Sequence, residues 1–246
     1  MNIASLVATS RLSAQQRAMD VTAANLANLN TPGHRAERVQ FADYLARQTR
    51  VEPPPGGRVI AFTQDRATWR EFKPGTMTQT GNPLDLAIPG DGFFTVETER
   101  GPRLTRAGRF TQNGAGEIVT ETGHALLDAN GQKLRVPAGT TRLGVSADGT
   151  IATQDGPIGR IGVRRPTDAM RMKAEGDHLF RPEGPTVPVE QPGIVQGAVE
   201  GSNVQPVLET VRMMRQLREF QFASQFVQAE SERIQNAIER ILRPRA

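Results

Sequence analysis

Three histidines, His34, His124 and His178, are the side chains of this 246-residue chain best suited to holding a metal or moving a proton. They fall in three separate segments, and no two have the spacing of metal ligands on one element. We therefore expect surface or turn histidines and no metal site. Since the chain has no cysteine, it also has no disulfide, iron–sulfur or thiolate–zinc site.

Asp85 and Asp91 flank a short apolar run and are the candidates for the paired carboxylates of a glycosidase. Asp85 lies between apolar neighbours, where it could cap a turn or pair with an arginine. Asp91 lies in a Pro-Gly-Asp-Gly turn, which favours local hydrogen bonds to its side chain. We interpret both residues as structural. The sequence also lacks the common nucleotide-binding and serine-hydrolase motifs, so we expect no catalytic residue, no cofactor and no enzyme.

The composition favours a small globular body with extended, partner-dependent parts. Hydrophobic residues make up 37% of the chain and aromatic residues 5%, which is lean for one compact core of this length. The net charge is only +4, basic residues are scattered among acidic ones, and there is one Trp and one Tyr, so we expect no nucleic-acid partner. No window reaches the roughly 18 apolar residues of a membrane span, so we expect no membrane insertion.

A helix is predicted over residues 4–29. One of its faces carries Leu12, Met19, Leu26 and Leu29. The helix should end at about Asn30, because the next residue precedes a proline and is disfavoured in the α conformation. The apolar face is thin, so this helix would be marginal alone.

A longer helix is predicted from Pro206 to Leu242, where no glycine or proline interrupts the chain. At about 1.5 Å per residue it would run roughly 55 Å, too long to be buried along its full length in a globule of this size. Residues at alternating steps of four and three form a heptad seam: Met213, Leu217, Phe220, Ser224, Val227, Ser231, Ile234, Ile238 and Ile241. We expect the two terminal helices to form an antiparallel pair; the alternative is that each is a core helix of an ordinary α+β domain.

Between the helices, turn signals recur at regular intervals and separate short β-type runs, as in an all-β sandwich or barrel-like body. The predicted fold class is therefore α+β, a discontinuous helical coiled-coil domain from both termini plus a central β domain. The expected divisions are residues 1–33 for the first helix, 34–73 for an irregular connector with a Pro/Gly linker at 51–57, 74–195 for the β domain and 196–246 for the second helix.

Three motifs carry a resemblance to a known family. They are Ala23–Gly33 (AANLANLNTPG), Gly81–Phe94 (GNPLDLAIPGDGFF) and Glu200–Val204 (EGSNV). In this order they resemble the axial proteins of the bacterial flagellum, the family of rod and hook subunits. Two positions depart from the family pattern: His34 stands where an aromatic residue is usual, and Gln205 where Asn commonly follows the third motif.

The resemblance implies a structural subunit of the basal-body rod, which polymerises into a helical tube that transmits torque and carries the export channel. Within the rod it favours the proximal over the distal part. The implied partners are other rod subunits, with self-association possible, and the export apparatus during secretion. It also implies export by the flagellar type III system without a cleaved signal peptide, and a final place in the rod as it crosses the periplasm. No acidic residue occurs before Asp20, in a segment rich in Ser, Ala, Gln and Thr.

The candidate functional residues are therefore assembly residues on the two helices. Besides the apolar face of the first helix, they are Met213, Leu217, Phe220, Val227, Ile234, Ile238 and Ile241. Asn25 and Asn28 are unusual inside a helix. A solvated face would explain them, but the resemblance favours a buried hydrogen bond that fixes register against a neighbouring helix. A secreted β-rich adhesin with coiled-coil ends is the alternative function; its helices should pair with parallel identical chains.

Overall fold

The computed structural model describes the backbone of residues 3–46 and 60–242, and the side chains of residues 7–40 and 68–239. It divides into two compact units. The terminal unit comprises residues 1–27, 37–69 and 205–246, and the β unit comprises residues 28–36 and 70–204. The predicted α+β class is confirmed, with a helix at each end and a β-rich body between them.

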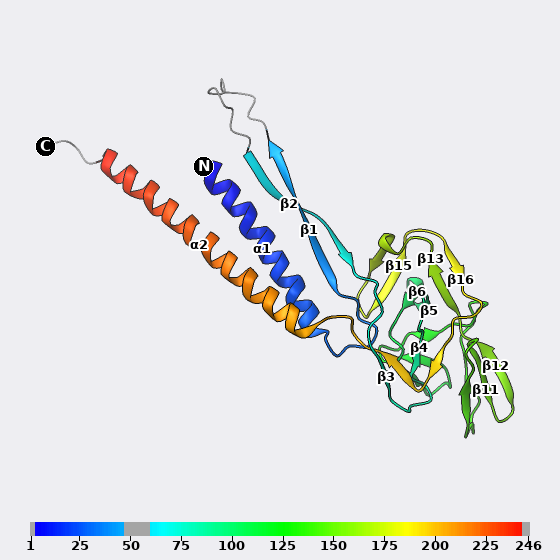
Figure 1. Ribbon diagram of the computed structural model, residues 1–246. Coiled ribbons are helices and arrows are strands. Elements are labelled where there is room, and N and C mark those ends of the chain that lie inside the picture. The colour runs from blue at the N-terminus through cyan, green and yellow to red at the C-terminus, as the bar shows by residue number, and fades with distance from the viewer. Residues whose placement is uncertain (1–2, 47–59, 243–246) are drawn as a thin grey trace. The chain divides into compact units, whose positions relative to one another are not determined.

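The terminal unit contains the helices α1 (Ile3–Ala27) and α2 (Pro206–Leu242) and the strands β1 (Glu37–Ala46) and β2 (Ile60–Arg70). The two helices pack against each other and run in opposite directions, and β1 lies beside α1 (Figure 1). The helix pair predicted from the heptad spacing is therefore confirmed.

Residues 34–73 were expected to be irregular, but the structure forms a two-stranded sheet there from β1 and β2. Strand formation follows from the Val, Phe, Tyr and Ile residues of these segments, which favour extended backbone. The Pro/Gly linker at 51–57 lies outside the described residues.

The β unit is built from short strands and one turn of 3₁₀ helix, η1 (Ala169–Arg171). Its strands are β3 (Met77–Gln79), β4 (Leu86–Ala87), β5 (Phe93–Thr98), β6 (Gly101–Thr105), β7 (Phe110–Gln112), β8 (Ile118–Thr120), β9 (Ala125–Leu126), β10 (Leu143–Val145), β11 (Thr150–Thr153), β12 (Gly156–Arg160), β13 (Val163–Pro166), β14 (Met172–Ala174), β15 (Leu179–Pro182), β16 (Thr186–Pro188), β17 (Val195–Gln196) and β18 (Ala198–Glu200).

One large sheet organises the β unit, in the order β14-β15-β6-β5-β9-β8-β7, and β13 joins it through β5 and carries β16. A three-stranded sheet, β10-β11-β12, and the pairs β17-β4 and β18-β3 complete the unit. The pairs β17-β4 and β18-β3 join the segment after residue 194 to strands more than 100 residues earlier in the chain.

Successive residues of β5 face opposite sides of the large sheet, as the pleat requires. Phe94 enters the main core and packs edge-to-face on Phe110, with ring centroids 5.3 Å apart. Phe93 faces the other way, into a smaller cluster with Leu104 and Phe180. The β unit therefore has two apolar layers, one on each side of β5.

The central sequence motif is a structural element of this unit. Asp85 is buried, accepts hydrogen bonds from Thr80 Oγ1 at 2.6 Å and Asn82 Nδ2 at 3.2 Å, and so closes a turn. The next residue, Leu86, donates its backbone N–H to Gly108 O at 2.8 Å. Of the two roles left open for Asp85, capping a turn or pairing with an arginine, the side-chain hydrogen bonds show the first.

Gly108 is required at this point by space. A Cβ atom added there would lie 1.8 Å from Leu86 O, so the backbone would have to shift. We expect Gly108→Ala to lower the free energy of unfolding by about 1–3 kcal/mol, as overpacking does elsewhere, visible as a lower thermal midpoint. Gly114→Ala is the control, because nothing lies within 4 Å of its Cβ position. Equal midpoints for the two variants would contradict the close approach.

Candidate assembly surface

Glu200 is a buried charged residue of the β unit with several polar partners. Only 1% of its surface is exposed, and its carboxylate lies 2.7 Å from Arg35 Nη2 and 3.2 Å from Arg106 Nη1. Oε1 also accepts the backbone N–H of Gly75 at 2.9 Å, and the backbone oxygen of Glu200 accepts that of Gly33 at 2.7 Å. We call Arg35, Arg106 and Glu200 the Glu200 cluster.

This cluster connects the three sequence motifs. Arg106 donates to the backbone oxygens of Ile88 at 2.8 Å and Gly90 at 2.5 Å, both in the central motif. Glu200 begins the third motif, and it binds Gly33 at the end of the first. Residues far apart in sequence thus share one buried carboxylate.

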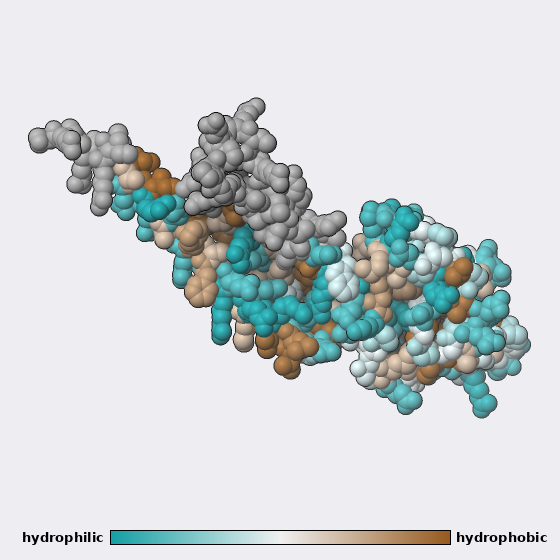
Figure 2. Space-filling model, turned by 45° about the horizontal axis from the view of Figure 1, so that its top comes forward, coloured by the Kyte–Doolittle hydropathy of each residue, from teal (hydrophilic) through white to brown (hydrophobic). Residues whose placement is uncertain are grey.

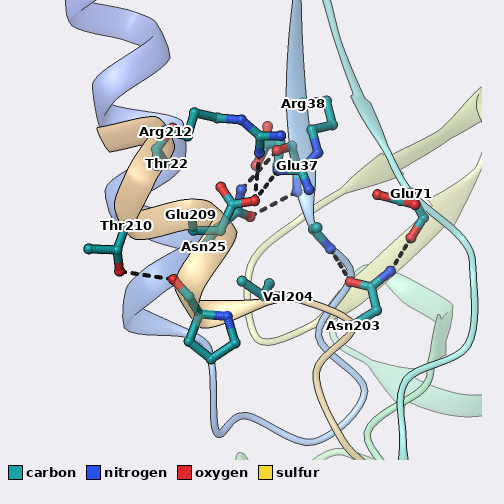
Figure 3. A network of polar contacts seen from close by, with 12 residues as sticks. Thr22, Asn25, Glu37, Arg38, Glu71, Asn203, Val204, Glu209, Thr210 and Arg212 are labelled. Carbon is teal, nitrogen blue, oxygen red and sulfur yellow. Dashed lines mark hydrogen bonds and ion pairs between the residues drawn. The ribbon is translucent and has the colours of Figure 1, made fainter. Parts of the chain in front are cut away.

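Asn203 of the third motif adds a second link within the β unit (Figure 3). Its Oδ1 accepts the backbone N–H of Ala36 at 2.7 Å, and its Nδ2 donates to the backbone oxygen of Glu71 at 2.7 Å and that of Lys73 at 3.0 Å. The Asn203 side chain therefore satisfies backbone hydrogen-bonding groups of two separate segments, at residue 36 and at residues 71–73.

The Glu200 cluster contains two positively charged guanidinium groups and one carboxylate. Burial lowers the pKa of Arg106 to about 10 against the attraction of Glu200, and the neighbouring Arg35 adds to the lowering. Burial likewise lowers the pKa of Arg35. The Arg106 guanidinium also lies 5.2 Å from the centre of the Phe93 ring. Glu200 is therefore the carboxylate in direct contact with two buried guanidinium groups, whose burial it partly offsets.

His34 differs from the expectation of a surface or turn residue. It is buried, its ring packs edge-on against His178 with centroids 5.7 Å apart, and neither ring nitrogen has a hydrogen-bond partner in the described part of the chain. Burial, followed by the charges of His178 and Arg70, lowers the pKa of His34 to about 4. The ring therefore serves as a neutral packing group, in the place of the aromatic residue usual in the family.

The terminal unit has its own buried carboxylate, Glu209, in the first turn of α2. Its Oε1 lies 2.7 Å from Arg38 Nη1 and 2.5 Å from Arg212 Nη1 (Figure 3). Near these groups Asn25 is buried and exchanges two hydrogen bonds of 2.9 Å with the backbone of Glu37 in β1. Asn25 thus makes the buried hydrogen bond, but its partner is a strand rather than a helix.

The remaining candidates on the first helix lie in different settings. Leu12, Met19 and Leu26 are half-buried, whereas the most buried α1 side chains are Ala14, Gln15, Ala18, Thr22 and Asn25. Small side chains on this strip let α2 approach closely, and Thr22 Oγ1 donates to Gln216 Oε1 at 2.9 Å. Leu29 and Asn28 belong to the β unit, where both are half-buried and Asn28 Oδ1 accepts from Thr31 Oγ1 at 3.1 Å.

The half-buried residues of α2 recur with the predicted heptad period, but every second position is displaced by one residue toward the N-terminus. Met213, Phe220 and Val227 are half-buried as members of the seam, but the alternate positions are Gln216, Ala223 and Glu230. The predicted members Leu217, Ser224 and Ser231 are exposed, with Leu217 at 47%. Ile234 and Ile238 are exposed as well, and the side chain of Ile241 lies outside the described residues.

A second apolar surface runs along α2 on the side away from this seam. Figure 2 shows hydrophobic side chains on the surface of the helical part. We call the following residues the outer stripe: Val207, Leu208, Val211, Met214, Phe222 and Phe226. Phe222 is 73% exposed, and groups of exposed apolar side chains of this kind mark interaction sites.

The charged anchors Glu200, Arg35, Arg106 and Glu209 were not predicted from the sequence. A signal existed for two of them: Glu209 occupies a seam position four residues before Met213, and Glu200 directly follows the apolar pair 198–199 of a short strand. Among the described side chains, no three His, Asp or Glu residues are grouped to hold a metal ion. Within that part of the chain, no helix is long and apolar enough to cross a membrane.

Comparison with protein families gives three matches that together span most of the chain. Residues 6–35 match the family described as flagella basal body rod protein. Residues 87–153 match the flagellar hook protein FlgE/F/G D1 domain, and residues 195–240 the C-terminal domain of flagellar basal body rod FlgEFG proteins. The three matches follow the order of the three motifs.

Individual relatives cover nearly the full length. The chain is 35% identical over 246 residues to the flagellar basal-body rod protein FlgF of Caulobacter vibrioides, covering 98% of each chain. It is 34% identical over 218 residues to FlgF of Mesorhizobium japonicum, covering 87% of this chain and 88% of the relative. It is 31% identical over 248 residues to the rod protein FlgG of Bacillus subtilis, covering 91% and 93%.

The Glu200 cluster predicts a large loss of stability for Glu200→Gln. The substitution removes the carboxylate in direct contact with two buried guanidinium groups, which costs about 3–5 kcal/mol. Urea unfolding should show this loss, while Glu190→Gln, at an exposed position, should unfold like the wild type. A Glu200→Gln variant of unchanged stability would show that the arginines do not need the carboxylate.

The buried His34 predicts that stability falls in mild acid. Its folded-state pKa of about 4 lies below the unfolded value of 6.5, so only the unfolded chain gains a proton there as the pH drops from 6.5 to 4. Stability is therefore lost across this window, by up to about 3 kcal/mol for this residue. His178, whose pKa is also lowered by burial, acts in the same direction.

We expect His34→Phe to flatten the stability profile between pH 6.5 and 4, measured by urea unfolding at each pH. His124→Gln is the control at a half-buried position elsewhere in the β unit. If His34→Phe kept the full acid dependence of the wild type, the neutral packing role of His34 would be wrong.

Proposed function

This chain belongs to the family of flagellar basal-body rod proteins, and from that premise we propose how it assembles as a structural subunit of the rod. We propose that it polymerises with other rod subunits into a helical tube that carries the export channel and transmits torque. The observation that supports this most is the outer stripe of α2, a set of exposed apolar side chains with no partner in the described part of the chain.

Open head-to-tail contacts between identical or related surfaces generate helical filaments. The helix pair suits such contacts, because α2 uses one face on α1 and presents another to neighbours. A parallel bundle of identical chains, as in an adhesin, would need the face that α1 already occupies. We therefore place the intersubunit contacts on Leu217, Ile234, Ile238 and the outer stripe. The other seam residues and the α1 candidates serve mainly the pairing within the chain.

Within the rod we propose a proximal, FlgF-like position, with an FlgG-like distal position as the alternative. Two FlgF relatives match at 35% and 34% identity, and an FlgG relative at 31%. The segments Arg17–Val21, Glu37–Phe41 and Asp43–Leu45 also resemble the proximal-rod protein more than the distal one.

We further propose export through the type III channel of the organelle before assembly. The first acidic residue is Asp20, and the apolar face of α1 is thin. A segment of this kind cannot offset its ordering entropy alone, so it can stay unfolded during export and form a helix when α2 covers it. The β domain of residues 74–195 would then fold as the globular part.

Two measurements test the structural role. The chain should be present in purified basal bodies, and cells that lack it should be non-motile and without complete rods. Normal motility and complete rods in its absence would refute the function.

The proposed intersubunit contact predicts a separation of assembly from folding. Leu217→Asp places a charge on an exposed side chain, so the thermal midpoint of the purified chain should change by less than about 2 °C. In an assembled rod the same charge would be desolvated, at a cost of several kcal/mol, and the variant should be missing from basal bodies. Ser146→Asp, at an exposed position of the β unit, is the control for charge. Normal incorporation of Leu217→Asp would show that this side of α2 faces no neighbour.

A further inference from the structure

Residues 194–204 bind parts of the β unit that lie far earlier in the chain. Their strands β17 and β18 pair with β4 and β3. The backbone N–H of Gly75 binds the Glu200 side chain across 125 residues, and that of Ala36 binds the Asn203 side chain across 167 residues. We call residues 194–204 the closing segment.

The closing segment is buried as well as hydrogen-bonded. Ile194 packs in the main core of the β unit, and three further apolar side chains of the segment are buried. Gln196 Nε2 donates to the backbone oxygens of Pro83 at 2.9 Å and Leu143 at 3.0 Å. Without the closing segment, these backbone groups would lose their partners and the main core would lose part of its apolar surface. The β unit is therefore complete only when this segment is in place.

Many other strand pairs of the β unit join strands that follow one another directly. β5 pairs with β6, β7 with β8, β8 with β9, β11 with β12 and β14 with β15. Closing a short loop costs less entropy than closing a long one, so such local contacts can form early in folding. The contacts of the closing segment with β3 and β4 span more than 100 residues and carry a larger entropy cost.

The closing segment also holds the two ends of the β unit together. The backbone N–H of Gly33, shortly after α1, binds Glu200 O at 2.7 Å, and the N–H of Asn203 binds His34 O at 3.3 Å. Pro206 begins α2 directly after this segment. The chain that follows α1 is thus bound to the chain that precedes α2, which raises the effective concentration of each helix for the other. This matters because α1 is marginal alone.

We propose that the closing segment docks after the sheets of the β unit have formed, and that its docking allows the two helices to pair. In an unfolded chain that passes through a channel, residues 33–36 and 194–204 cannot meet while the chain between them is still inside. The helix pair therefore forms only after most of the chain has passed through. This role in export rests on the proposed function, whereas the order of folding does not depend on it.

Refolding of the full-length chain, followed by pulsed hydrogen exchange, tests the order. The backbone N–H groups of Gly33, Gly81 and Gly201 bind or belong to the closing segment, and those of Ile118 and Thr120 lie in β8 of the large sheet. We expect the three glycine amides to gain protection at least about tenfold more slowly than the two sheet amides, because their contacts close longer loops. Protection of both groups at the same rate would overturn the proposed order.

Asn203→Ala tests the coupling to the helices. It removes three hydrogen bonds, to residue 36 and to residues 71 and 73. We expect native-state hydrogen exchange of the α1 amides to become at least about tenfold faster, because a loosened closing segment no longer favours helix pairing. If α1 kept its wild-type protection while the Gly201 amide lost its own, the coupling would be absent and the proposal overturned.

Asn113→Ala is the matched control. The Asn113 side chain also makes three hydrogen bonds, but all of them lie within one turn of the β unit, to residues 115 and 117. Exchange of the α1 amides should stay within about twofold of the wild type. An equal acceleration in both variants would mean that α1 responds to any loss of stability, which would also overturn the coupling.

Asn203→Asp is a milder variant, for use if the alanine variant does not fold. It keeps the acceptor for the Ala36 N–H and loses the two donated bonds, so α1 exchange should still accelerate, by a smaller factor. Unchanged α1 exchange beside faster exchange of Gly201 would overturn the coupling here too. These experiments use the purified chain, so their failure is distinct from absence of the chain from basal bodies, which would refute the proposed function.

Discussion

The β unit depends on one buried carboxylate that contacts two buried arginines. Glu200, Arg35 and Arg106 come from three separate segments, and each arginine also binds backbone oxygens of its surroundings. A buried ion pair contributes little net stability when complete, but loss of its counter-charge is very costly. A fold that did not bring these three segments together would bury at least one of the charged groups without its partner. The cluster thus holds together segments that lie far apart in this sequence.

The terminal unit solves a different problem, because its helices must pair within the chain and still offer surface to neighbours. Directional polar contacts set the internal pairing: Thr22 with Gln216, Asn25 with Glu37, and Glu209 with its two arginines. Small α1 side chains allow close approach without using the large apolar residues of α2. The larger side chains, such as Phe222 and Phe226, are thereby left outside.

The features that follow from periodicity were predictable from the sequence. The α2 boundaries, the helix pair and the strand at 93–96 follow from spacings that the backbone imposes. The hairpin of β1 and β2 was missed because its strands are interspersed with charged residues and flank a Pro/Gly linker. Glu200 and Glu209 were missed for a deeper reason: a charged residue is normally assigned to the surface, and only the fold reveals that an arginine from a distant segment meets it. The shift from Leu217 to Gln216 on the seam likewise depends on Thr22, a residue of the other helix.

Apolar surface and charge have separate roles in a subunit of this kind. The outer stripe provides attraction without direction, so by itself it would tolerate neighbours displaced along the helix. Related rod proteins share the fold and would present similar stripes, which makes apolar contact a poor means of discrimination. Charges discriminate better, because like charges brought together cost several kcal/mol and unlike charges fix the register. Exposed arginines, Arg215 and Arg218, lie between the outer-stripe residues Met214 and Phe222, so one helix carries both kinds of group. In the proposed assembly the apolar residues would make association favourable, and the charges would restrict which neighbour fits.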